Sequence, residues 1–362
     1  MKDRLTKLRQ LLKEQNLDAA LISSVPNIFY LTGYGGFSIE ERDAFVLITQ
    51  NASYIFTHAL FAESMGTAIP HMKLIEFTRE KRLTAALQEL IKKHSLKTIG
   101  IEENNLTVAE YKKVTTLPVT FSDMHLSNLR EIKEATELKT LKKACEVSDE
   151  AFTFIATQLK PGVTEKEIER MLELFFVEHG ASPSFRSVVC FGKNASVPHH
   201  LSGETKLQKR DCVLIDMGAK VDGYCADVCR TFFIGDPSEK EKHVYETVKV
   251  AMEKAIAFAK TQIKEAKTLS TKALDAVARD YIVSQGYDSY PHLLGHGVGL
   301  EVHEAPHLSP YIPTELKNGM VFTMEPGVYL PGKFGVRIED VFTLQDNQLI
   351  QLSTVSKEIL SL

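Results

Sequence analysis

The chain has 362 residues, of which 44% are hydrophobic and 25% are charged, and its formal net charge is −4. Such a chain can bury a large core, and its length is that of two domains, or three. Because the sequence has no basic surplus, we expect neither nucleic acid nor a membrane surface as a partner.

The N-terminal segment and the cysteines indicate where the protein works. The first residues are charged and amphipathic, and no run of about 18 apolar residues occurs, so we expect no secretory leader and no transmembrane helix. The cysteines number five, and Cys225 and Cys229 fall within one predicted strand, where they cannot bridge each other. Both features favour the reducing cytoplasm and argue against a set of structural disulfides.

Helices and strands alternate from the start of the chain to about residue 125. An amphipathic helix ends near Gln15, and a second helix is predicted near residues 80–94. Four short apolar segments read as buried strands: DAALISS, AFVLITQ, ASYIFT and KTIGIEE. This alternation predicts an α/β domain over residues 1–127.

The remainder, residues 128–362, has a different pattern. It opens with a long helix through about Leu159, and a second helix begins at Thr164, where Glu167 completes a capping box. Two further helices begin near Ser238 and near residue 270. The predicted strands are SVVCFG, CVLIDMG, YCADVCRTFFIG, MVFTMEPGVYL and GVRIEDVFTL. Strands lining a site with helices outside them give an α+β arrangement.

Two acidic residues of the strand region are the first candidates for a site. Asp216 ends the apolar run VLID, and Asp227 follows eleven residues later on the next predicted strand. A hairpin would bring both carboxylates to one place. Taken singly, an acidic residue at a strand end is more often a cap or a turn residue.

Three more residues extend this set. His296 lies among glycines in LLGHGVGLEVHE, and Glu325 and Glu339 lie in apolar predicted strands. An unpaired carboxylate in such a place is costly or becomes protonated, and several together repel one another. Two divalent cations and a hydroxide bridging them would make the site nearly neutral. The competing interpretation is structural ion pairing, for example of Glu339 with Arg337.

These residues resemble the pita-bread metallopeptidases, the family that includes aminopeptidase P, prolidase and methionine aminopeptidase. The resemblance covers the second domain throughout and implies a pita-bread catalytic domain behind a smaller, creatinase-like α/β domain. The matching motifs are VLIDMG with Asp216, GYCADVCRTF with Asp227, HLLGHGVGLEVHE with His296, TMEPGVY with Glu325 and GVRIED with Glu339.

The resemblance implies a role for each ligand at a site with two metal ions. Asp227 and Glu339 would bridge the ions, Asp216 would complete one of them, and His296 with Glu325 would complete the other. Glu325 would also carry a proton. Oxygen ligands with one imidazole suit Mn²⁺ or Co²⁺, with Zn²⁺ and Fe²⁺ as alternatives.

Three further histidines match positions of the family. By resemblance, His303 would hydrogen-bond the developing tetrahedral oxygen or the scissile nitrogen, and His199 and His292 would line the substrate pocket. The spacing to Asp216 favours His199 over its neighbour His200. A histidine near a glycine-rich turn is otherwise commonly structural.

Three positions bear on how the site is supported and what it accepts. Arg337 shares a predicted strand face with Glu339 and could orient a bridging carboxylate; a surface salt bridge is the alternative. Cys229 stands where relatives usually carry threonine, and its thiol is a weaker hydrogen-bond partner than a hydroxyl. His307 stands where some prolidases place an arginine that grips the free carboxylate of a dipeptide.

The resemblance implies an exopeptidase that hydrolyses the N-terminal Xaa-Pro bond of peptides or dipeptides. The missing arginine leaves dipeptidase specificity open and favours longer peptides. A homodimer is implied as well, because creatinase-like domains of relatives pack against a partner subunit. Two alternatives remain: a metal-free C–N hydrolase of the creatinase type, and a binding protein on the same fold.

Overall fold

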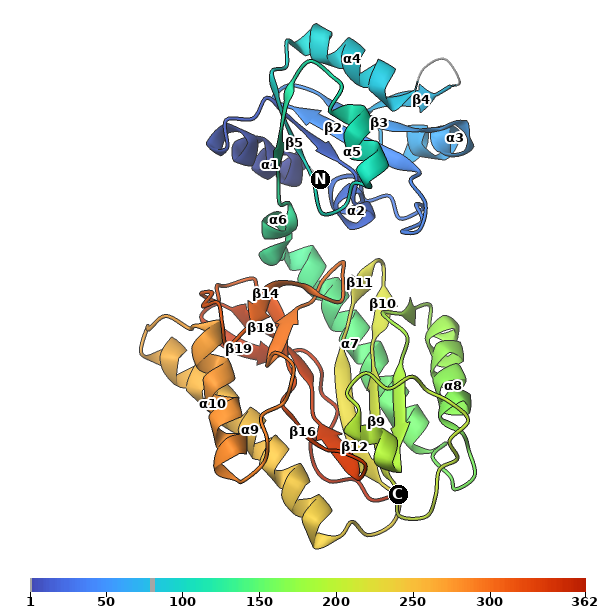
Figure 1. The fold of residues 1–362 in the computed structure, drawn as a ribbon, viewed down its shortest axis with the longest axis vertical. Helices are drawn as coiled ribbons and strands as arrows, with labels where there is room; N and C mark the ends of the chain where they lie inside the picture. The colour runs from blue at the N-terminus through green and yellow to red at the C-terminus, as the bar shows by residue number, and fades with distance from the viewer. Residues whose placement is uncertain (1, 79–81) are drawn as a thin grey trace. The chain divides into compact units, whose positions relative to one another are not determined.

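A computed structural model describes residues 2–78 and 82–362. The chain divides into two compact units, Met1–Arg130 and Glu131–Leu362, called here the N-terminal unit and the C-terminal unit (Figure 1). Each unit has its own buried apolar core, and each is described by itself.

The N-terminal unit is built on a mixed sheet of six strands in the order β4-β3-β2-β1-β5-β6. Its strands are β1 (Ala19–Ile22), β2 (Ala44–Thr49), β3 (Ser53–His58), β4 (Lys73–Phe77), β5 (Thr98–Ile101) and β6 (Thr120–Asp123). Its helices are α1 (Lys2–Glu14), α2 (Val25–Thr32), α3 (Ala59–Ala68), α4 (Leu83–His94) and α5 (Val108–Val114). The four predicted strands are confirmed as β1, β2, β3 and β5.

The elements that the sequence did not reveal in this unit carry weak apolar patterns. Strands β4 and β6 lie at the two edges of the sheet and are partly exposed, and α5 buries only Val114. Helices α2 and α3 are short, and the sequence patterns did not predict them. The helix predicted from about residue 80 begins at Leu83 in the structure, and residues 80 and 81 lie outside the described residues.

The C-terminal unit holds several small sheets between two helix pairs. Its helices are α6 (Ser127–Glu131, which crosses the division), α7 (Ala135–Ala156), α8 (Glu165–Glu178), α9 (Glu239–Lys264) and α10 (Thr271–Ser284). Figure 1 shows α7 and α8 on one side of the strands and α9 and α10 on the other. The helices predicted near Ser238 and residue 270 are confirmed, whereas the predicted long helix is interrupted between α6 and α7 and ends at Ala156.

Two sheets carry the site. The first has the order β12-β9-β8 and the second the order β14-β13-β15-β18-β19, while β16 pairs with β17 and β10 joins β11 to β7. The strands are β7 (Ser182–Pro183), β8 (Val188–Phe191), β9 (Cys212–Met217), β10 (Ala219–Val221), β11 (Tyr224–Cys225), β12 (Val228–Phe233), β13 (Gly295–Gly297), β14 (Glu304–Leu308), β15 (Val321–Met324), β16 (Gly327–Leu330), β17 (Phe334–Arg337), β18 (Asp340–Gln345) and β19 (Gln348–Gln351).

Local capping fixes where α8 begins. The Oγ1 of Thr164 accepts the main-chain N–H of Glu167 at 3.2 Å, and the Glu167 carboxylate accepts the N–H of Thr164 at 2.8 Å. These bonds satisfy donors that have no partner within the helix. The predicted capping box is therefore confirmed.

Three predicted strands are broken, each at an acidic residue. Asp227 separates β11 from β12, Glu325 separates β15 from β16, and Glu339 separates β17 from β18. Pro326, which lacks an N–H to donate to a ladder, reinforces the second break. The chain changes sheets at each break, so the carboxylates stand at strand ends and not within continuous strands as we expected.

The cysteines also differ from one expectation and agree with another. Cys225 lies on β11 and Cys229 on β12, so they do not share a strand. All five cysteines are free and buried, which confirms that the protein has no structural disulfides. Over the described residues, no helix is both long and apolar enough to cross a membrane.

Candidate metal centre

Strands β9 and β12 bring the two aspartates together. They pair antiparallel with Cys229 opposite Asp216, and Asp227 directly precedes β12. The intervening chain passes close by at Gly218, where an added Cβ would lie 1.8 Å from the carbonyl oxygen of Ala226. Glycine at this position therefore permits the approach on which the carboxylate pair depends.

Glu339 reaches the same place from the other sheet. Its main-chain N–H donates to the carbonyl oxygen of Cys229 at 3.0 Å, which links the β17–β18 break to β12. One carboxylate oxygen each of Asp216, Asp227 and Glu339 lie within 4.8 Å of one another. Residues more than 100 positions apart in the chain thus form one acidic cluster.

His296 completes the arrangement from the short strand β13. An added Cβ at Gly295 would lie 2.0 Å from the oxygen of Thr323, and one at Gly297 would lie 2.1 Å from the oxygen of Ala305. Only glycine on each side lets β13 fit this closely between β15 and β14. The expectation of close backbone approach around His296 is confirmed.

The ring of His296 presents its Nε2 to the acids. This atom lies 3.6 Å from a carboxylate oxygen of Asp227 and 3.6 Å from one of Glu325. The Nδ1 lies 3.1 Å from the carbonyl oxygen of Gly297, which can only accept a hydrogen bond, so Nδ1 carries the proton. Nε2 is then a free lone pair directed at the cluster, as a metal ligand requires.

The pKa values show how unfavourable this cluster is without a cation. Burial, followed by the neighbouring carboxylates, raises the pKa of Asp227 and of Glu339 above the ordinary carboxyl range. Burial also raises the pKa of Glu325 to about 8 and lowers that of His296 to about 4. The acids resist ionisation and the imidazole resists protonation; a bound cation would favour the ionised acids and would keep the imidazole neutral.

Unsatisfied oxygens provide an independent test of metal binding. Among the described residues, Asp216 Oδ1, Asp227 Oδ1 and Glu339 Oε1 are buried and have no hydrogen-bond partner. Buried polar atoms normally find partners, and three orphaned oxygens facing one cluster point to a missing cation. The residues therefore fit divalent metal ions, with Glu325 and His296 offering the remaining ligand atoms.

Arg337 supports the cluster in a way that differs from both sequence interpretations. It is only 3% exposed, so it forms no surface salt bridge. Its Nη2 donates to Asp216 Oδ2 at 2.5 Å, and its Nη1 donates to the hydroxyl of Tyr329 at 2.8 Å. The carboxylate that it orients is thus that of Asp216, because β17 runs beside β9, and not that of Glu339.

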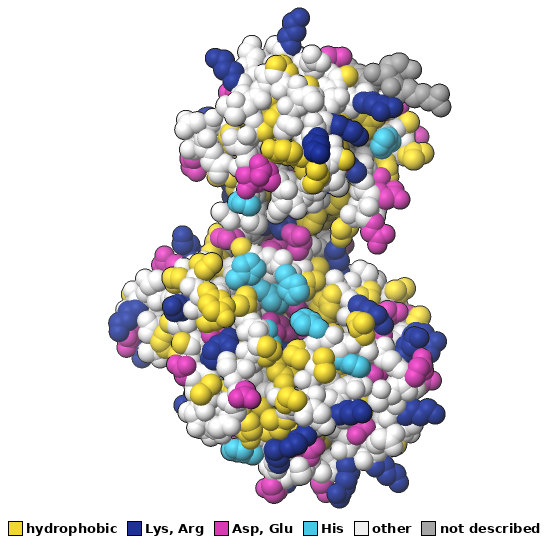
Figure 2. Space-filling model, in the orientation of Figure 1, with side chains coloured by type: hydrophobic (Ala, Val, Ile, Leu, Met, Phe, Trp, Pro, Cys, Tyr) yellow, Lys and Arg dark blue, Asp and Glu magenta, His cyan; other side chains and the backbone are white. Residues whose placement is uncertain are grey.

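Histidines surround the acids on one face of this unit, where Figure 2 shows several of them gathered. The ring of His303 lies 4.4 Å from that of His296, edge to face, and is exposed. His292 is held by Tyr329, whose hydroxyl lies 2.9 Å from its Nε2, and its Nδ1 lies 3.7 Å from Glu325 Oε2. Burial lowers the pKa of His292 to about 3, so it stays neutral.

The two adjacent histidines have different surroundings. The Nε2 of His200 lies 2.9 Å from a carboxylate oxygen of the fully buried Glu165, which also accepts the N–H of Gly203. His199 is exposed, and its charge would lower the pKa of both His292 and His303. His200 thus has a structural partner, and His199 is the one on the side of the site.

The family of the chain follows from two matches. Residues 139–346 match the metallopeptidase family M24, and residues 4–132 match the creatinase/prolidase N-terminal domain. The chain belongs to metallopeptidase family M24.

Relatives of this M24 chain match it over nearly its whole length. An Xaa-Pro dipeptidase from Pyrococcus horikoshii is 32% identical over 99% of each chain. The structure of an Xaa-Pro dipeptidase from Bacillus anthracis has a TM-score of 0.91 at 30% identity, covering 100% of this chain and 99% of that one. An X-Pro aminopeptidase from Thermotoga maritima has a TM-score of 0.85 at 30% identity, covering 96% and 98%.

These matches confirm the expected fold class, a creatinase-like α/β domain followed by a pita-bread catalytic domain of the M24 type. As a member of a metallopeptidase family, the chain is a peptidase that uses divalent metal ions. The alternative of a binding protein or creatinase-type hydrolase is not favoured.

Cys229 and His307, the two positions at which we expected a departure from the family, have different surroundings. Cys229 is fully buried, and burial raises the pKa of its thiol well above the ordinary value, so it is a poor metal ligand. His307 lies on β14 opposite His296 and is exposed. Sequence reasoning missed Tyr329; its place in the motif TMEPGVY, four residues after Glu325, was the only signal.

Proposed function

We propose that this M24 peptidase is a dinuclear-metal exopeptidase that hydrolyses the Xaa-Pro bond at the N-terminus of its substrates. The observation that carries the proposal is the convergence of Asp216, Asp227, His296, Glu325 and Glu339, with three carboxylate oxygens left unsatisfied. The names of the relatives, which are Xaa-Pro dipeptidases and an X-Pro aminopeptidase, support the choice of bond.

The five residues divide between two ions. By resemblance to the family, Asp227 and Glu339 would bridge the ions, Asp216 would complete the coordination of one ion, and His296 with Glu325 that of the other. When bound, two such ions lower the pKa of a water molecule and polarise the scissile carbonyl. Mn²⁺ and Co²⁺ suit this set of oxygens and one imidazole, as do Zn²⁺ and Fe²⁺.

Proton transfer falls to Glu325. An Xaa-Pro bond has no N–H, and its nitrogen must receive a proton in order to leave. The Glu325 carboxylate already favours its protonated form, because burial raises its pKa to about 8. That value belongs to the metal-free centre; with metal ions bound, the ionised carboxylate would take a proton from the attacking water and deliver it to the proline nitrogen.

The histidines bind the substrate around this centre. His303, beside His296, would donate to the oxygen on which negative charge develops, or to the scissile nitrogen. His292, held by Tyr329, and the exposed His199 would line the pocket. The neutral state of His292 suits contact with an uncharged part of the peptide.

Two observations bear on the length of the substrate. The M24 chain has His307 in place of an arginine that could grip a free carboxylate with two hydrogen bonds, which favours peptides longer than two residues. Several relatives are named dipeptidases, which favours Xaa-Pro dipeptides. We therefore propose both longer Xaa-Pro peptides and Xaa-Pro dipeptides as substrates. Their rates of hydrolysis, measured side by side, show which is preferred.

The test is a comparison of substrates on protein of known metal content. Chelator-treated protein is reloaded with Mn²⁺ or Co²⁺ in turn, its metal is measured by mass spectrometry, and an Xaa-Pro dipeptide, an Xaa-Pro-Yaa tripeptide and an Xaa-Ala dipeptide are assayed. About two ions per chain are expected, with hydrolysis confined to the substrates that contain proline. No bound metal after reloading, or faster cleavage of the Xaa-Ala control, would contradict the proposal.

The homodimer and the cytoplasmic location also belong to this proposal. The five free cysteines are consistent with a reducing compartment. Sedimentation of the purified protein measures the oligomeric state, and a monomer at micromolar concentration would contradict the dimer. Fractionation of the source cells tests the location.

A further inference from the structure

Arg230, on β12, is the most completely engaged cation near the metal centre. It is 1% exposed, and its guanidinium uses all five of its N–H groups at distances from 2.6 to 3.0 Å. The acceptors are the main-chain oxygens of Cys229, Glu339, Val355 and Ser356 and the carboxylate of Asp340.

The guanidinium holds the peptide group of a proposed metal ligand. Its Nη1 donates to the carbonyl oxygen of Glu339 at 2.6 Å, whereas the N–H of Cys229 reaches the same oxygen only at 3.4 Å. Glu339 lies in the break between β17 and β18, where a regular ladder does not hold the chain. The hydrogen bond from Arg230 is therefore the shorter restraint on this carbonyl.

A buried network fixes Arg230 in turn. The Asp340 carboxylate is fully buried and accepts from Arg230 Nη2 at 2.6 Å, from Ser353 Oγ at 2.7 Å and from Lys357 Nζ at 2.9 Å. Removing one partner of a buried, fully bonded network leaves the others unsatisfied. Segment 353–358, which follows β19, thus supports Arg230 both directly and through Asp340.

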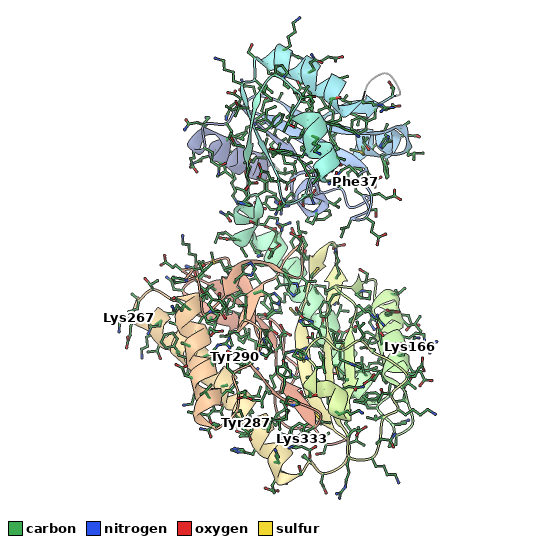
Figure 3. All side chains as sticks on the ribbon, in the orientation of Figure 1. Phe37, Lys166, Lys267, Tyr287, Tyr290 and Lys333 are labelled. Carbon is green, nitrogen blue, oxygen red and sulfur yellow. The ribbon has the colours of Figure 1, made fainter. Side chains whose placement is uncertain are left out.

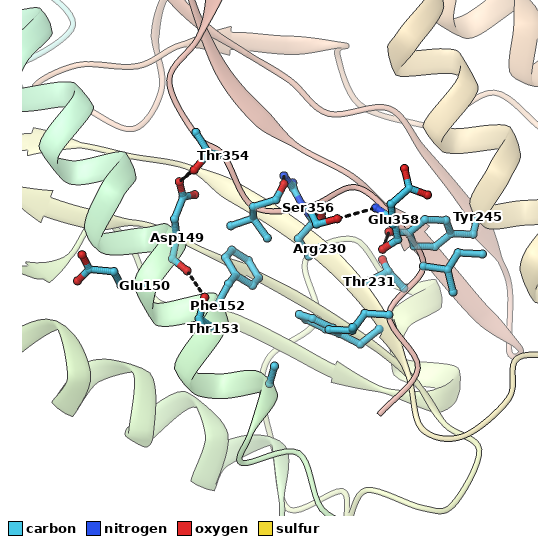
Figure 4. A pocket seen from close by; sticks show the side chains of 15 residues that line it. Asp149, Glu150, Phe152, Thr153, Arg230, Thr231, Tyr245, Thr354, Ser356 and Glu358 are labelled. Atoms are coloured by element: carbon cyan, nitrogen blue, oxygen red, sulfur yellow. Dashed lines mark hydrogen bonds between the residues drawn. The ribbon is translucent and has the colours of Figure 1, made fainter.

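Segment 353–358 is held by polar contacts above a cavity. Figure 4 shows this cavity, of about 490 Å³, with Arg230, Asp149 and Tyr245 among its lining residues. Asp149 of α7 accepts the N–H and the hydroxyl of Thr354 at 2.7 and 2.6 Å. The hydroxyl of Tyr245 donates to main-chain oxygens of the segment at 3.3 Å. These hydrogen bonds restrain the segment beside the cavity.

We propose that Arg230 is a positioning residue for Glu339 and that Asp340 and segment 353–358 hold Arg230 in place. It touches neither the substrate nor the metal ions, and it acts through the main-chain carbonyl of Glu339. The inference rests on the proposed function, because Glu339 must be a metal ligand for its position to matter. Partners that orient a ligand typically alter metal affinity by about 10–100-fold when they are removed.

The molecule offers a matched control in Arg279 on α10. Arg279 also pairs with a fully buried aspartate, Asp275, at 2.6 and 2.7 Å, and it also donates to main-chain oxygens, those of Tyr290 and His292. Figure 3 labels Tyr290 in the C-terminal unit. The two arginines share chemistry and burial of the partner, but only Arg230 holds the peptide of a proposed ligand.

The experiment measures metal affinity and not turnover. Mn²⁺ is titrated calorimetrically into the metal-free forms of wild type, Arg230→Gln, Arg230→Lys, Ser353→Ala and Arg279→Gln, with circular dichroism and thermal unfolding on each. Arg230→Gln is expected to bind Mn²⁺ about 10–100-fold more weakly, Arg230→Lys less so, and Ser353→Ala about two- to tenfold more weakly. Arg279→Gln is expected to keep the wild-type affinity even if its melting temperature falls.

The outcomes separate this inference from the proposed function. A wild type that binds no Mn²⁺ refutes the proposed function. A wild type that binds Mn²⁺, with equal affinity in the Arg230 variants and in Ser353→Ala, overturns the positioning role. Equal weakening in Arg279→Gln overturns it as well, because the effect would then follow from lost stability alone. If Arg230→Gln does not fold, the Mn²⁺ affinities of Arg230→Lys and Ser353→Ala are compared with that of the wild type instead. Equal affinities would again overturn the positioning role.

Discussion

A buried carboxylate of the N-terminal unit and the acids of the metal cluster in the C-terminal unit differ in how they are satisfied. In the N-terminal unit, Glu102 is 3% exposed, and its oxygens accept the main-chain N–H groups of Ser23 and Ser24 and the side-chain amide of Asn27, at 2.5 to 2.8 Å. These donors stand at the start of α2, where helix N–H groups lack partners. Glu102 therefore completes the fold of its unit with protein groups alone.

The acids of the metal cluster in the C-terminal unit have no such supply of donors. Asp216, Asp227 and Glu339 each keep a buried oxygen without a partner, and they lie against one another. Burial alone therefore does not mark a functional acid. What distinguishes the two regions is whether protein groups satisfy the charge, and in the acidic cluster they leave oxygens free for the proposed cations.

The largest expected effect is on turnover, and it comes from Glu325 in the acidic cluster. Glu325→Gln should keep the fold and lower kcat by about 10²–10⁴-fold, because an amide cannot carry the proton that the proline nitrogen needs. Turnover on an Xaa-Pro substrate and the circular dichroism spectrum are measured together. Wild-type turnover in this variant would mean that another group carries the proton.

A somewhat smaller loss is expected from the histidine beside the cluster. His303→Ala should lower kcat by about 10²–10³-fold, since it removes a donor to the charge that develops in the transition state. Its metal content, measured by mass spectrometry, should stay close to that of the wild type. Loss of both metals would identify His303 as a metal ligand, which would then belong to the cluster.

The pH dependence of stability sharpens the contrast between paired and unpaired acids. In the metal-free protein the folded-state pKa of Glu325 is raised to about 8, so the folded state binds more protons than the unfolded state between about pH 4.5 and 8. Stability from this group is therefore present at low pH and is lost as the pH rises through about 8. His296, with a pKa lowered to about 4, has the opposite effect, but only below about pH 6.5.

From pH 6.5 to 8 the effect of His296 is absent, and Asp227 and Glu339, whose pKa values are also raised, act in the same direction as Glu325. We expect the metal-free protein to lose on the order of 2 kcal/mol over this interval, and the Mn²⁺-loaded protein to lose much less. Denaturant unfolding at several pH values, with chelator and with Mn²⁺, measures both. Glu325→Gln serves as the control, because it removes one of the titrating groups and should make the loss smaller. A metal-free protein that gains stability over the interval would refute the assignment.

The smallest effect is expected from Glu102, the buried carboxylate whose hydrogen bonds come from protein groups. Glu102→Gln should destabilise the N-terminal unit by about 1–3 kcal/mol, because an amide accepts fewer of the hydrogen bonds around α2. Metal content per folded chain should not change, since Glu102 is absent from the cluster. Unfolding and metal analysis are compared in the same preparation. Loss of metal at full folding would show that the two regions are not independent.

Sequence patterns predicted those parts of the structure that depend on neighbours in the chain. The apolar segments that became β1, β2, β3 and β5 are buried over almost their whole length, and the capping box at Thr164 depends on residues three positions apart. Short edge elements such as β4 and α5 were missed, because they bury too little to leave a pattern. The breaks at Asp227, Glu325 and Glu339 were missed because the apolar runs continue through them.

By itself, the sequence determined which side chains can hold metal, in what order they occur and which of them need glycine beside them. Those are properties of residue types and short motifs. The tertiary structure alone decided that Arg337 holds Asp216, that His200 belongs to Glu165, and that Arg230 supports Glu339. These pairs join residues 35 to 121 positions apart, and no local pattern specifies such a contact. It arises only when sheets and helices pack and each buried charge must find its partner.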